Sequence, residues 1–415
     1  MKFSRREFIA GAAVTSATAA FRLDSHAQPV GEQPAQQPQA RAGKATMICS
    51  LNGFELRGKP LDYLDRGWAI LNKGGDTLDA ALAVVRGPED DPNDDSVGYG
   101  GLPNEEGVVE LDSCCVHGPT RTMGSVGGVR NIKNVAALGN AVRLHTGHVM
   151  LVGEGAERFG YAQGFAKENL LTERSRKIWM LWKEMHSNQD WWGPGLGSPE
   201  WKPPVNPDKQ ITEQWQQRYR KLEVIAADLG IEPDFRMAAI QRVLHPPTGT
   251  IHCSACNEKG EISGVTTTSG LAWKIPGRCG DSPVLGAGCW TDQDVGSAGA
   301  TGNGEENIKV AGAHTIVENM RKGMSPQEAG MDALKRIARN FNNDMTRLRY
   351  VSMFYYILRK DGAHAGVTLW SGRSGRPRRY AVHDGSKHAE TAASLFQGEA
   401  IDWPPIPKLP DEKGE

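Results

Sequence analysis

The spacing of hydrophobic residues in the first half of the chain predicts a mixture of strands and helices. An apolar run at 45–51 (ATMICSL) is typical of a strand, whereas 61–72 and 77–85 carry apolar residues at helical spacing, separated by the Gly74-Gly75 pair. The other elements expected before residue 244 are strands at 108–117, 120–126 and 148–152 and helices at 131–144, 155–164, 172–186, 213–227 and 233–243.

The second half repeats this mixture. Two strands are expected at 250–257 and 261–268, joined by a turn at 258–260. Helices are expected at 305–321 and 326–339, and strands at 350–358, 365–370 and 379–383. Because strands and helices occur in separate runs within each half, the pattern indicates an α+β fold, with two sheets sandwiched between helical layers.

Between these halves, segment 187–208 (SNQDWWGPGLGSPEWKPPVNPD) is rich in Pro, Gly and Trp. This composition is typical of a long surface loop or an insertion. The segment either lies over a binding site or is a solvated loop, and the sequence leaves both readings open.

The first 27 residues differ from the rest of the chain. A basic start with Arg5-Arg6, an apolar stretch at 8–21 and the small-x-small triplet Ser25-His26-Ala27 are typical of a twin-arginine export signal. The alternative is a chance arginine pair on an ordinary N-terminus. The stretch is too short to span a bilayer stably, and no later segment reaches about 18 apolar residues. We therefore expect an exported, periplasmic protein, free of the membrane once the signal is removed, with 28–44 as a disordered leader.

The composition excludes several classes of partner. The chain has 415 residues, 39% of them hydrophobic, and a formal net charge of −1, so charge provides no case for nucleic acid or anionic membrane. Seven cysteines in a chain of this length do not indicate a disulfide framework. Cys253 and Cys256 resemble half of a zinc or redox motif, but no second pair completes four ligands. Two cysteines on a core strand is the preferred reading, and we expect no metal.

The stretch HPPTGTIHCSA at 245–255 places a Gly-Thr bond directly before an apolar run. A threonine hydroxyl is a poor nucleophile unless a base lies beside it, and an N-terminal threonine can use its own α-amino group. Such an amine has a pKa of about 7.7–8.0, so much of it is neutral near pH 7. Cleavage between Gly249 and Thr250 would create it. From spacing alone, a linker that meets a strand explains the stretch equally well.

Two further segments carry candidate chemistry. In GRCGDSP (277–283), Arg278 can bind a carboxylate in bidentate fashion and Asp281 can pair with an ammonium group, which together suit an α-amino acid. A salt bridge within the loop is the alternative. In GATGNGEENI (299–308), a Gly-rich turn that opens a helix offers backbone N–H groups to an anion, although it is neither a Walker loop nor a Rossmann fingerprint.

Taken in order, five segments resemble the glycosylasparaginase family, a branch of the N-terminal nucleophile hydrolases. They are DDSVGYGGLPNEEGVVELDS (94–113), VGGVRNIKN (126–134), GTI (249–251), GEISGVTTTSGLAWKIPGRCGDSPVLGAG (260–288) and GATGNGEE (299–306). Together they spread over most of residues 45–340, and five ordered motifs are far more specific than any one of them.

The resemblance implies a four-layer αββα sandwich, made as one precursor that cleaves itself into subunits 45–249 and 250–415. It requires no metal or organic cofactor, and the family often assembles as a dimer of αβ heterodimers. By motif position the nucleophile is Thr250 rather than Thr248, and Thr268 supplies a second hydroxyl that contacts it.

The same resemblance assigns the substrate contacts. Arg278 and Asp281 match the positions that bind the α-carboxylate and the α-amino group of the substrate. Thr301 and Gly302 match the oxyanion hole. The implied reaction attacks the side-chain amide of an asparagine-type small molecule and releases aspartate.

Two features depart from the family pattern. Glycosylasparaginases usually carry Asp before the nucleophile, where it takes part in self-cleavage, whereas this chain has Gly249, as do plant-type asparaginases. Many members also carry a Trp on the first strand, and here 49–52 reads CSLN.

The sequence therefore predicts a self-processing amidohydrolase acting on N4-(β-N-acetylglucosaminyl)-L-asparagine. An L-asparaginase or β-aspartyl peptidase on the same scaffold is the alternative within the class. A non-catalytic glycan-binding protein that uses the Trp-rich segment, or a zinc or redox protein that uses Cys253 and Cys256, are alternatives from other classes.

Overall fold

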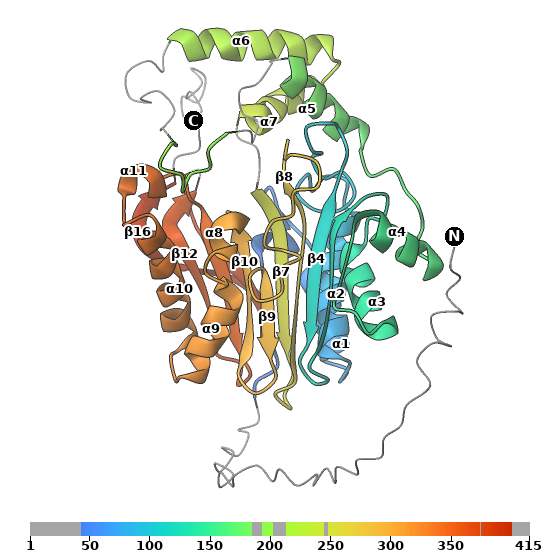
Figure 1. Ribbon diagram of the computed structural model, residues 1–415, viewed down its shortest axis with the longest axis vertical. Helices are drawn as coiled ribbons and strands as arrows, with labels where there is room; N and C mark the ends of the chain where they lie inside the picture. Colours follow the sequence, from blue (N-terminus) through green and yellow to red (C-terminus); the bar gives the residue numbers. More distant parts are fainter. Residues whose placement is uncertain (1–42, 185–192, 202–212, 245–247, 374, 401–415) are drawn as a thin grey trace, which may run out of the picture. The chain divides into compact units, whose positions relative to one another are not determined.

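Two β-sheets organise the described part of the chain. The computed structural model describes residues 43–184, 193–201, 213–244, 248–373 and 375–400, which belong to one compact unit (Figure 1). The expected export signal and nearly all of the leader lie outside these residues. Of the helices described, none combines the length and apolar character that crossing a bilayer requires.

The larger sheet has eight strands in the order β15-β14-β1-β7-β8-β4-β5-β6, antiparallel except between β5 and β6. Its strands are β1 (Thr46–Cys49), β4 (Leu111–His117), β5 (Thr122–Val129), β6 (Met150–Val152), β7 (Thr248–Cys256), β8 (Ile262–Leu271), β14 (Arg379–His383) and β15 (Lys387–Thr391). Strand β7, which contains the Gly249–Thr250 bond, and its neighbour β8 thus lie in the middle of this sheet.

The smaller sheet has six strands in the order β13-β12-β11-β10-β9, with β16 paired parallel to β12. These strands are β9 (Cys289–Asp292), β10 (Gly296–Gly302), β11 (Met353–Arg359), β12 (His364–Arg373), β13 (Arg376–Pro377) and β16 (Ala393–Glu399). A separate hairpin joins β2 (Glu55–Leu56) to β3 (Lys59–Pro60), after the short helix η1 (Leu51–Gly53).

Helices cover the sheets (Figure 1), and their buried apolar residues share clusters with residues of the strands. Helices α1 (Tyr63–Leu71), α2 (Thr77–Asp90), α3 (Val135–His145) and α4 (Gly153–Ala162) pack against the larger sheet, and α9 (Gly312–Arg321) and α10 (Pro326–Asn340) against the smaller one. Polar contacts link β7 to β10 of the other sheet, where the Ser254 and Ser297 hydroxyls lie 2.7 Å apart. The expected mixture of helices and sheets is thereby confirmed.

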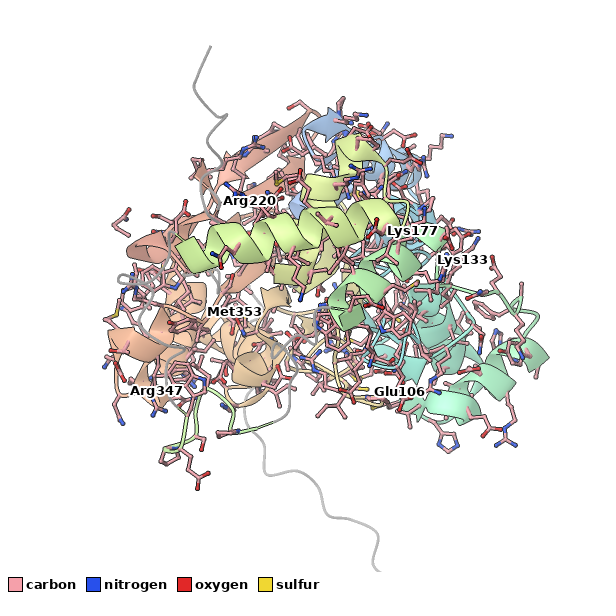
Figure 2. All side chains as sticks on the ribbon, turned by 90° about the horizontal axis from the view of Figure 1, so that it is seen from above. Glu106, Lys133, Lys177, Arg220, Arg347 and Met353 are labelled. Carbon is pink, nitrogen blue, oxygen red and sulfur yellow. The ribbon has the colours of Figure 1, made fainter. Side chains whose placement is uncertain are left out.

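A group of three helices, which we call the helical cap, lies at the end of the strands where β7 begins. It consists of α5 (Glu173–Glu184), α6 (Glu213–Asp228) and α7 (Pro233–Leu244), and Figures 1 and 2 show α6 crossing above the strand ends. Leu222, Ile240 and Trp182 of the cap share one buried cluster with Trp273, which follows β8. Burial of these large side chains fixes the cap on the sheet.

Some sequence-based boundaries are wrong. The helix expected at 305–321 is two helices, α8 (Gly304–Ile308) and α9, because Ala311 adopts a left-handed conformation with φ 44°. Strand β10 was not expected, since its sequence GSAGATG lacks apolar alternation. It forms because β9 and β11 provide hydrogen-bonding partners on both sides.

Only 193–201 of the Trp-rich segment 187–208 is described. Arg347, in the short helix α11 (Met345–Leu348), donates from Nη1 to the carbonyls of Leu196 and Ser198 over 3.0 and 2.8 Å. Trp201 packs edge-on against Tyr350, with ring centroids 5.5 Å apart. This part of the segment is therefore anchored beside α11, while most of its described residues remain exposed to solvent.

Candidate active site

Gly249 and Thr250 begin strand β7, where a bulge interrupts the ladder to β8. Gly249 lies opposite Gly270 and Thr250 opposite Thr268, with the register shift between the two pairs. The Thr250 hydroxyl donates to Thr268 Oγ1 over 3.0 Å, and the Thr268 hydroxyl donates to the carbonyl oxygen of Gly249. The two hydroxyls and the carbonyl of the Gly249–Thr250 bond therefore form one hydrogen-bonded chain.

Thr268 is locked in this arrangement by its own strand. Its side chain is almost fully buried, and the Gly270 N–H donates to its Oγ1 over 2.8 Å. A threonine hydroxyl has one proton to donate and two lone pairs to accept with. With both acceptor positions used by Thr250 and Gly270, the single Thr268 proton is directed at the Gly249 carbonyl.

Ser96 packs directly against the Cα of Gly249 and forms a wall beside it. A Cβ atom built on Gly249 would overlap the Cβ of Ser96, so close contact excludes a side chain there. Ser96 is held on β8, because the Ser269 N–H and hydroxyl donate to its carbonyl over 3.1 and 2.7 Å. In this backbone arrangement position 249 has no room for the Asp that glycosylasparaginases usually carry there.

A buried carboxyl group lies behind this wall. The Ser96 hydroxyl and backbone N–H both donate to Asp94 Oδ1, the latter over 3.0 Å, and Asn52 Nδ2 donates to Asp94 Oδ2 over 3.3 Å. Burial raises the pKa of Asp94 to about 6 against the opposing effect of these hydrogen bonds. Asp94 is thus the carboxyl group that the structure connects to Gly249, through Ser96.

Arg278 lies in the loop after β8, beside the same ladder. A Cβ on Gly270, the partner of Gly249, would be 3.3 Å from Arg278 Nη1. Arg278 donates from Nε and Nη2 to the two carboxylate oxygens of Glu305 over 2.8 and 2.9 Å. A carboxylate therefore already occupies the bidentate edge of the guanidinium, the edge that binds planar anions best.

Asp281 lies in the same loop and is buried. Asn307 Nδ2 donates to its Oδ2 over 2.7 Å, and a Cβ on Gly304 would be 2.7 Å from its Oδ1. Burial raises the pKa of Asp281 to about 6, although Asn307 and Arg278 oppose this shift. Helix α8, which carries Gly304, Glu305 and Asn307, positions both charged residues of the loop.

Thr301 and Gly302 end strand β10 and lead into the same helix. The Thr301 hydroxyl lies 3.1 Å from the Tyr356 hydroxyl. Gly302 has a φ of 126°, and a Cβ there would strike the Ser352 carbonyl oxygen, so glycine is required at this position. Neither residue makes a side-chain hydrogen bond to Thr250 among the residues described. Strand β10, which carries both residues, leads into α8 and packs against β7 through the contact of Ser297 with Ser254.

Cys253 and Cys256 do not form a joint site. Cys253 packs in the cluster beneath α1 and α2, whereas Cys256 packs with Phe354 and Tyr356 in another. Burial raises the pKa of Cys256 to about 12, and that of Cys253 well above its ordinary value. Because the two thiols enter different clusters, they cannot bind one ion together. Across the described residues no group of three or more His, Cys, Asp or Glu side chains could hold a metal.

No pattern in the sequence predicted a role for Ser96, Glu305 or Asn307. Ser96 and Glu305 lie inside the quoted segments 94–113 and 299–306, and Asn307 follows directly. No spacing rule connects Ser96 with Gly249 or Glu305 with Arg278, because these contacts join different elements. Membership of a matching segment was the one available signal.

Comparison with known proteins agrees with this geometry. Residues 57–348, which include every candidate site residue, match a family described as asparaginase. The chain is 37% identical over 317 residues to an N(4)-(beta-N-acetylglucosaminyl)-L-asparaginase of Elizabethkingia miricola, with 76% of each chain covered. It is 30% identical over 282 residues to the protein of that name from Rattus norvegicus, covering 67% of this chain and 74% of the relative.

A putative protein of the same name from Drosophila melanogaster is 33% identical over 290 residues, with 68% of each chain covered. The family match reaches from the turn between β2 and β3 to α11, and it includes β7 and β8 of the larger sheet and β9 and β10 of the smaller one. The chain therefore belongs to the glycosylasparaginase family of N-terminal nucleophile amidohydrolases.

Proposed function

We propose that this chain activates itself by cutting the Gly249–Thr250 bond and then hydrolyses the side-chain amide of a substituted asparagine. The products of cleavage are subunits 45–249 and 250–415, which remain folded as one αββα sandwich. The observation that carries this proposal is the chain of hydrogen bonds from Thr250 through Thr268 to the Gly249 carbonyl.

In self-cleavage, Thr250 Oγ1 attacks the Gly249 carbonyl carbon and the acyl group moves from nitrogen to oxygen. Water then hydrolyses the ester, which leaves a carboxylate on Gly249 and a free amine on Thr250. The Thr268 hydroxyl lies on the carbonyl oxygen, where negative charge develops. A donor placed there stabilises the tetrahedral intermediate.

In the mature enzyme the Thr250 amine serves as the base for its own hydroxyl. The hydroxyl attacks the side-chain amide carbon, the amine passes the proton to the departing nitrogen, and water hydrolyses the aspartyl ester. Arg278 binds the α-carboxylate and Asp281 the α-ammonium group, while Thr301 and Gly302 stabilise the oxyanion. Apart from the substrate and the hydrolytic water, every group named in these steps belongs to this chain.

The substrate we favour is N4-(β-N-acetylglucosaminyl)-L-asparagine, the compound in the names of the relatives from Elizabethkingia miricola and Rattus norvegicus. Its hydrolysis releases aspartate and the glycosylamine. Asparagine itself and β-aspartyl peptides present the same aspartyl group and are the second candidates. Gly249 supports them, because plant-type asparaginases also carry Gly before the threonine, and Ser96 leaves no room for a larger residue there.

Export and assembly extend the proposal. The twin-arginine segment at 1–27 would direct the folded precursor to the periplasm, and two αβ heterodimers would form the working enzyme. Size-exclusion chromatography with light scattering tests the second point, and cell fractionation tests the first.

The test of the main proposal is a denaturing gel of the purified protein with N-terminal sequencing of each band. We expect two bands, one of which starts TIHCSA. The processed protein should release aspartate from N4-(β-N-acetylglucosaminyl)-L-asparagine, and rates on asparagine and a β-aspartyl dipeptide rank the substrates. A single intact chain that stays stable on incubation and binds glycans without turnover would overturn the proposal.

A further inference from the structure

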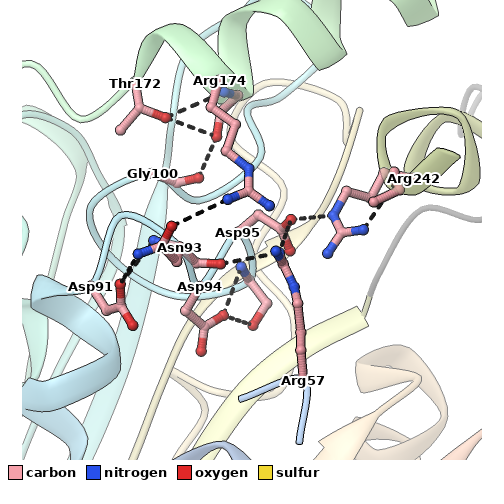
Figure 3. A network of polar contacts seen from close by, with 12 residues as sticks. Arg57, Asp91, Asn93, Asp94, Asp95, Gly100, Thr172, Arg174 and Arg242 are labelled. Atoms are coloured by element: carbon pink, nitrogen blue, oxygen red, sulfur yellow. Dashed lines mark hydrogen bonds and ion pairs between the residues drawn. The ribbon is translucent and has the colours of Figure 1, made fainter. Parts of the chain in front are cut away.

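The helical cap reaches the cleavage site through one ion pair. Arg242 lies in α7, seven residues before Gly249 along the chain, and its Nε bonds to the carboxylate of Asp95 (Figure 3). The two side chains are only 18% and 9% exposed, so solvent screens this pair much less than it screens a surface pair. Asp95 directly precedes Ser96, the residue that forms the wall beside Gly249.

A second arginine holds Asp95 from the other side. Arg57, in the turn between β2 and β3, donates from Nη2 to Asp95 Oδ2 over 3.4 Å and to the Asn93 carbonyl over 3.2 Å. Asp95 thus bridges two guanidinium groups that come from opposite sides of the loop. Partial burial lowers the pKa of Arg57, and the charge of Arg242 lowers it further. Without the Asp95 charge, two like charges would be left close together.

The loop that carries this bridge is braced along its length. Arg174 of α5 donates from Nη1 to Asn93 Oδ1 over 3.2 Å, and Asp91 accepts from Asn93 (Figure 3). The Leu102 N–H donates to the Asp95 carbonyl over 2.9 Å. The loop is therefore held by α5, by α7 and by the turn after η1, and it transmits the position of α7 to Ser96.

Both sides of the scissile bond are fixed by different means. Downstream, Thr250 is fixed by the β7–β8 ladder. Upstream, the chain leaves α7 at Leu244 and must reach Gly249 within five residues, a span of at most about 17 Å. The Arg242–Asp95 pair sets where this span starts, and Ser96 sets where the Gly249 Cα lies.

We propose that the Arg57–Asp95–Arg242 bridge positions the Gly249 carbonyl for attack, so that these residues act in self-cleavage and not in turnover. This inference rests on the proposed self-cleavage at Gly249–Thr250. Asp95, Arg57 and Arg242 are positioning residues, since they touch neither the carbonyl nor the nucleophile. After the cut, the connection from α7 to Gly249 takes no part in the reaction. The bridge is then dispensable for amide hydrolysis.

The test follows cleavage in time after cell-free synthesis of the full chain, with samples stopped in denaturant and resolved on a gel. Asp95→Asn and Arg242→Gln should lengthen the half-time of cleavage by about 10–100-fold, the effect expected from displacing a reacting group by about 1 Å. Material of these variants that has become fully processed should keep kcat/KM within about twofold of the unmodified enzyme. Arg242→Lys, which keeps the charge, should restore part of the rate.

Two controls separate this role from a general loss of structure. Arg86→Gln breaks an exposed pair with Asp90 on α2 and should leave the cleavage rate unchanged. The same bridge substitutions in a Thr250→Ala chain, which cannot cleave, should leave its circular dichroism spectrum unchanged. Unchanged cleavage half-times, or equal losses of cleavage and kcat/KM, would overturn the inference. If the unmodified chain itself yields no cleaved bands, the proposed function fails instead.

Discussion

The start of β7 and the loop after β8 lie beside the same ladder but are built in opposite ways. At β7 the contacts of Thr250 and Gly249 with Thr268 are neutral hydrogen bonds between neighbouring strands. In the loop, Arg278 and Asp281 are charged, and their partners come from α8, which lies in another part of the chain. Under the proposed function, strand register would set the geometry of bond cleavage, whereas burial and charge would set substrate binding. The two functions should therefore respond separately to substitution.

The largest effect is expected from Thr250→Ala, which removes the shared element of both functions. Self-cleavage should stop, and amide hydrolysis should fall by roughly 10⁶-fold, as for the loss of other hydrolase nucleophiles. A gel and an aspartate-release assay measure both. Thr248→Ala, two residues upstream on the same strand, is the matched control and should cleave normally. A fully processed Thr250→Ala chain would remove Thr250 from its assigned role.

Arg278→Ala should impair substrate binding without affecting self-cleavage. Charge-assisted hydrogen bonds are worth about 1.5–3 kcal/mol each, so losing a bidentate contact to the substrate carboxylate should raise KM about 100-fold or more. Self-cleavage should proceed at its usual rate, because it involves no free substrate. Loss of processing in this variant would mean that Arg278 supports the β7–β8 ladder and that the separation is wrong.

Gly249→Ala should have the opposite effect, slowing self-cleavage without affecting amide hydrolysis. The added Cβ would overlap the Ser96 Cβ, and overpacking of this kind costs about 1–3 kcal/mol, so self-cleavage should slow by about tenfold or more. Once cleaved, residue 249 is only a chain end, and kcat/KM should match that of the unmodified enzyme. A Ser96→Gly substitution in the same chain should restore the space and part of the rate. Cleavage of Gly249→Ala at the normal rate would show that the wall is not rigid.

The pH dependence of kcat/KM should report the ionisation of Asp281 in the loop after β8. Both the Thr250 amine, with a pKa of about 7.7–8.0 as a free α-amino group, and Asp281 must be unprotonated for reaction. Burial raises the pKa of Asp281 to about 6, so protonation should remove its charge as the pH falls below 6. As the pH is lowered from about 8 to 6, the logarithm of kcat/KM should therefore decrease with a slope of one. Below pH 6 it should decrease with a steeper slope.

In Asp281→Asn the overall kcat/KM should be lower and the steeper part of this profile should disappear. The cleavage half-time of the precursor, measured across the same pH range, serves as the comparison. A steep acid limb that persists in Asp281→Asn would assign it to another group, of which Asp94, with a pKa raised to about 6 by burial, is the first to test.

The smallest effect is expected from Glu305→Gln. Glu305 occupies the bidentate edge of Arg278, and its own side chain is half exposed, so the pair is weak. A substrate carboxylate must compete for this edge, and removal of the Glu305 charge should lower KM by about two- to fivefold. Steady-state kinetics measure this directly. A higher KM would mean that Glu305 orients Arg278 for the substrate instead of competing with it.

Parts of the fold were readable from the sequence because they depend on neighbouring residues. The hairpin of β7 and β8 follows from two apolar strands around a turn in which Gly260 has a φ of 75°. In the structure this hairpin brings Thr250 opposite Thr268, a pair that the sequence predicted through the family resemblance and not from the hairpin register. Strand β10 could not be predicted from the sequence, because it depends on its neighbours in the sheet. The break between α8 and α9 at Ala311 could not be predicted either, because it depends on packing.

The sequence by itself determined the candidate groups: a Gly-Thr bond at the head of a strand, an Arg and an Asp in one loop and, through the family resemblance, Thr268. Only the tertiary structure decided how these groups are set, because Ser96 against Gly249, Glu305 on Arg278 and Arg242 on Asp95 are contacts between distant segments. A hairpin register is fixed by local hydrogen bonds. Burial, steric exclusion and charge pairing arise only when distant segments exclude water together.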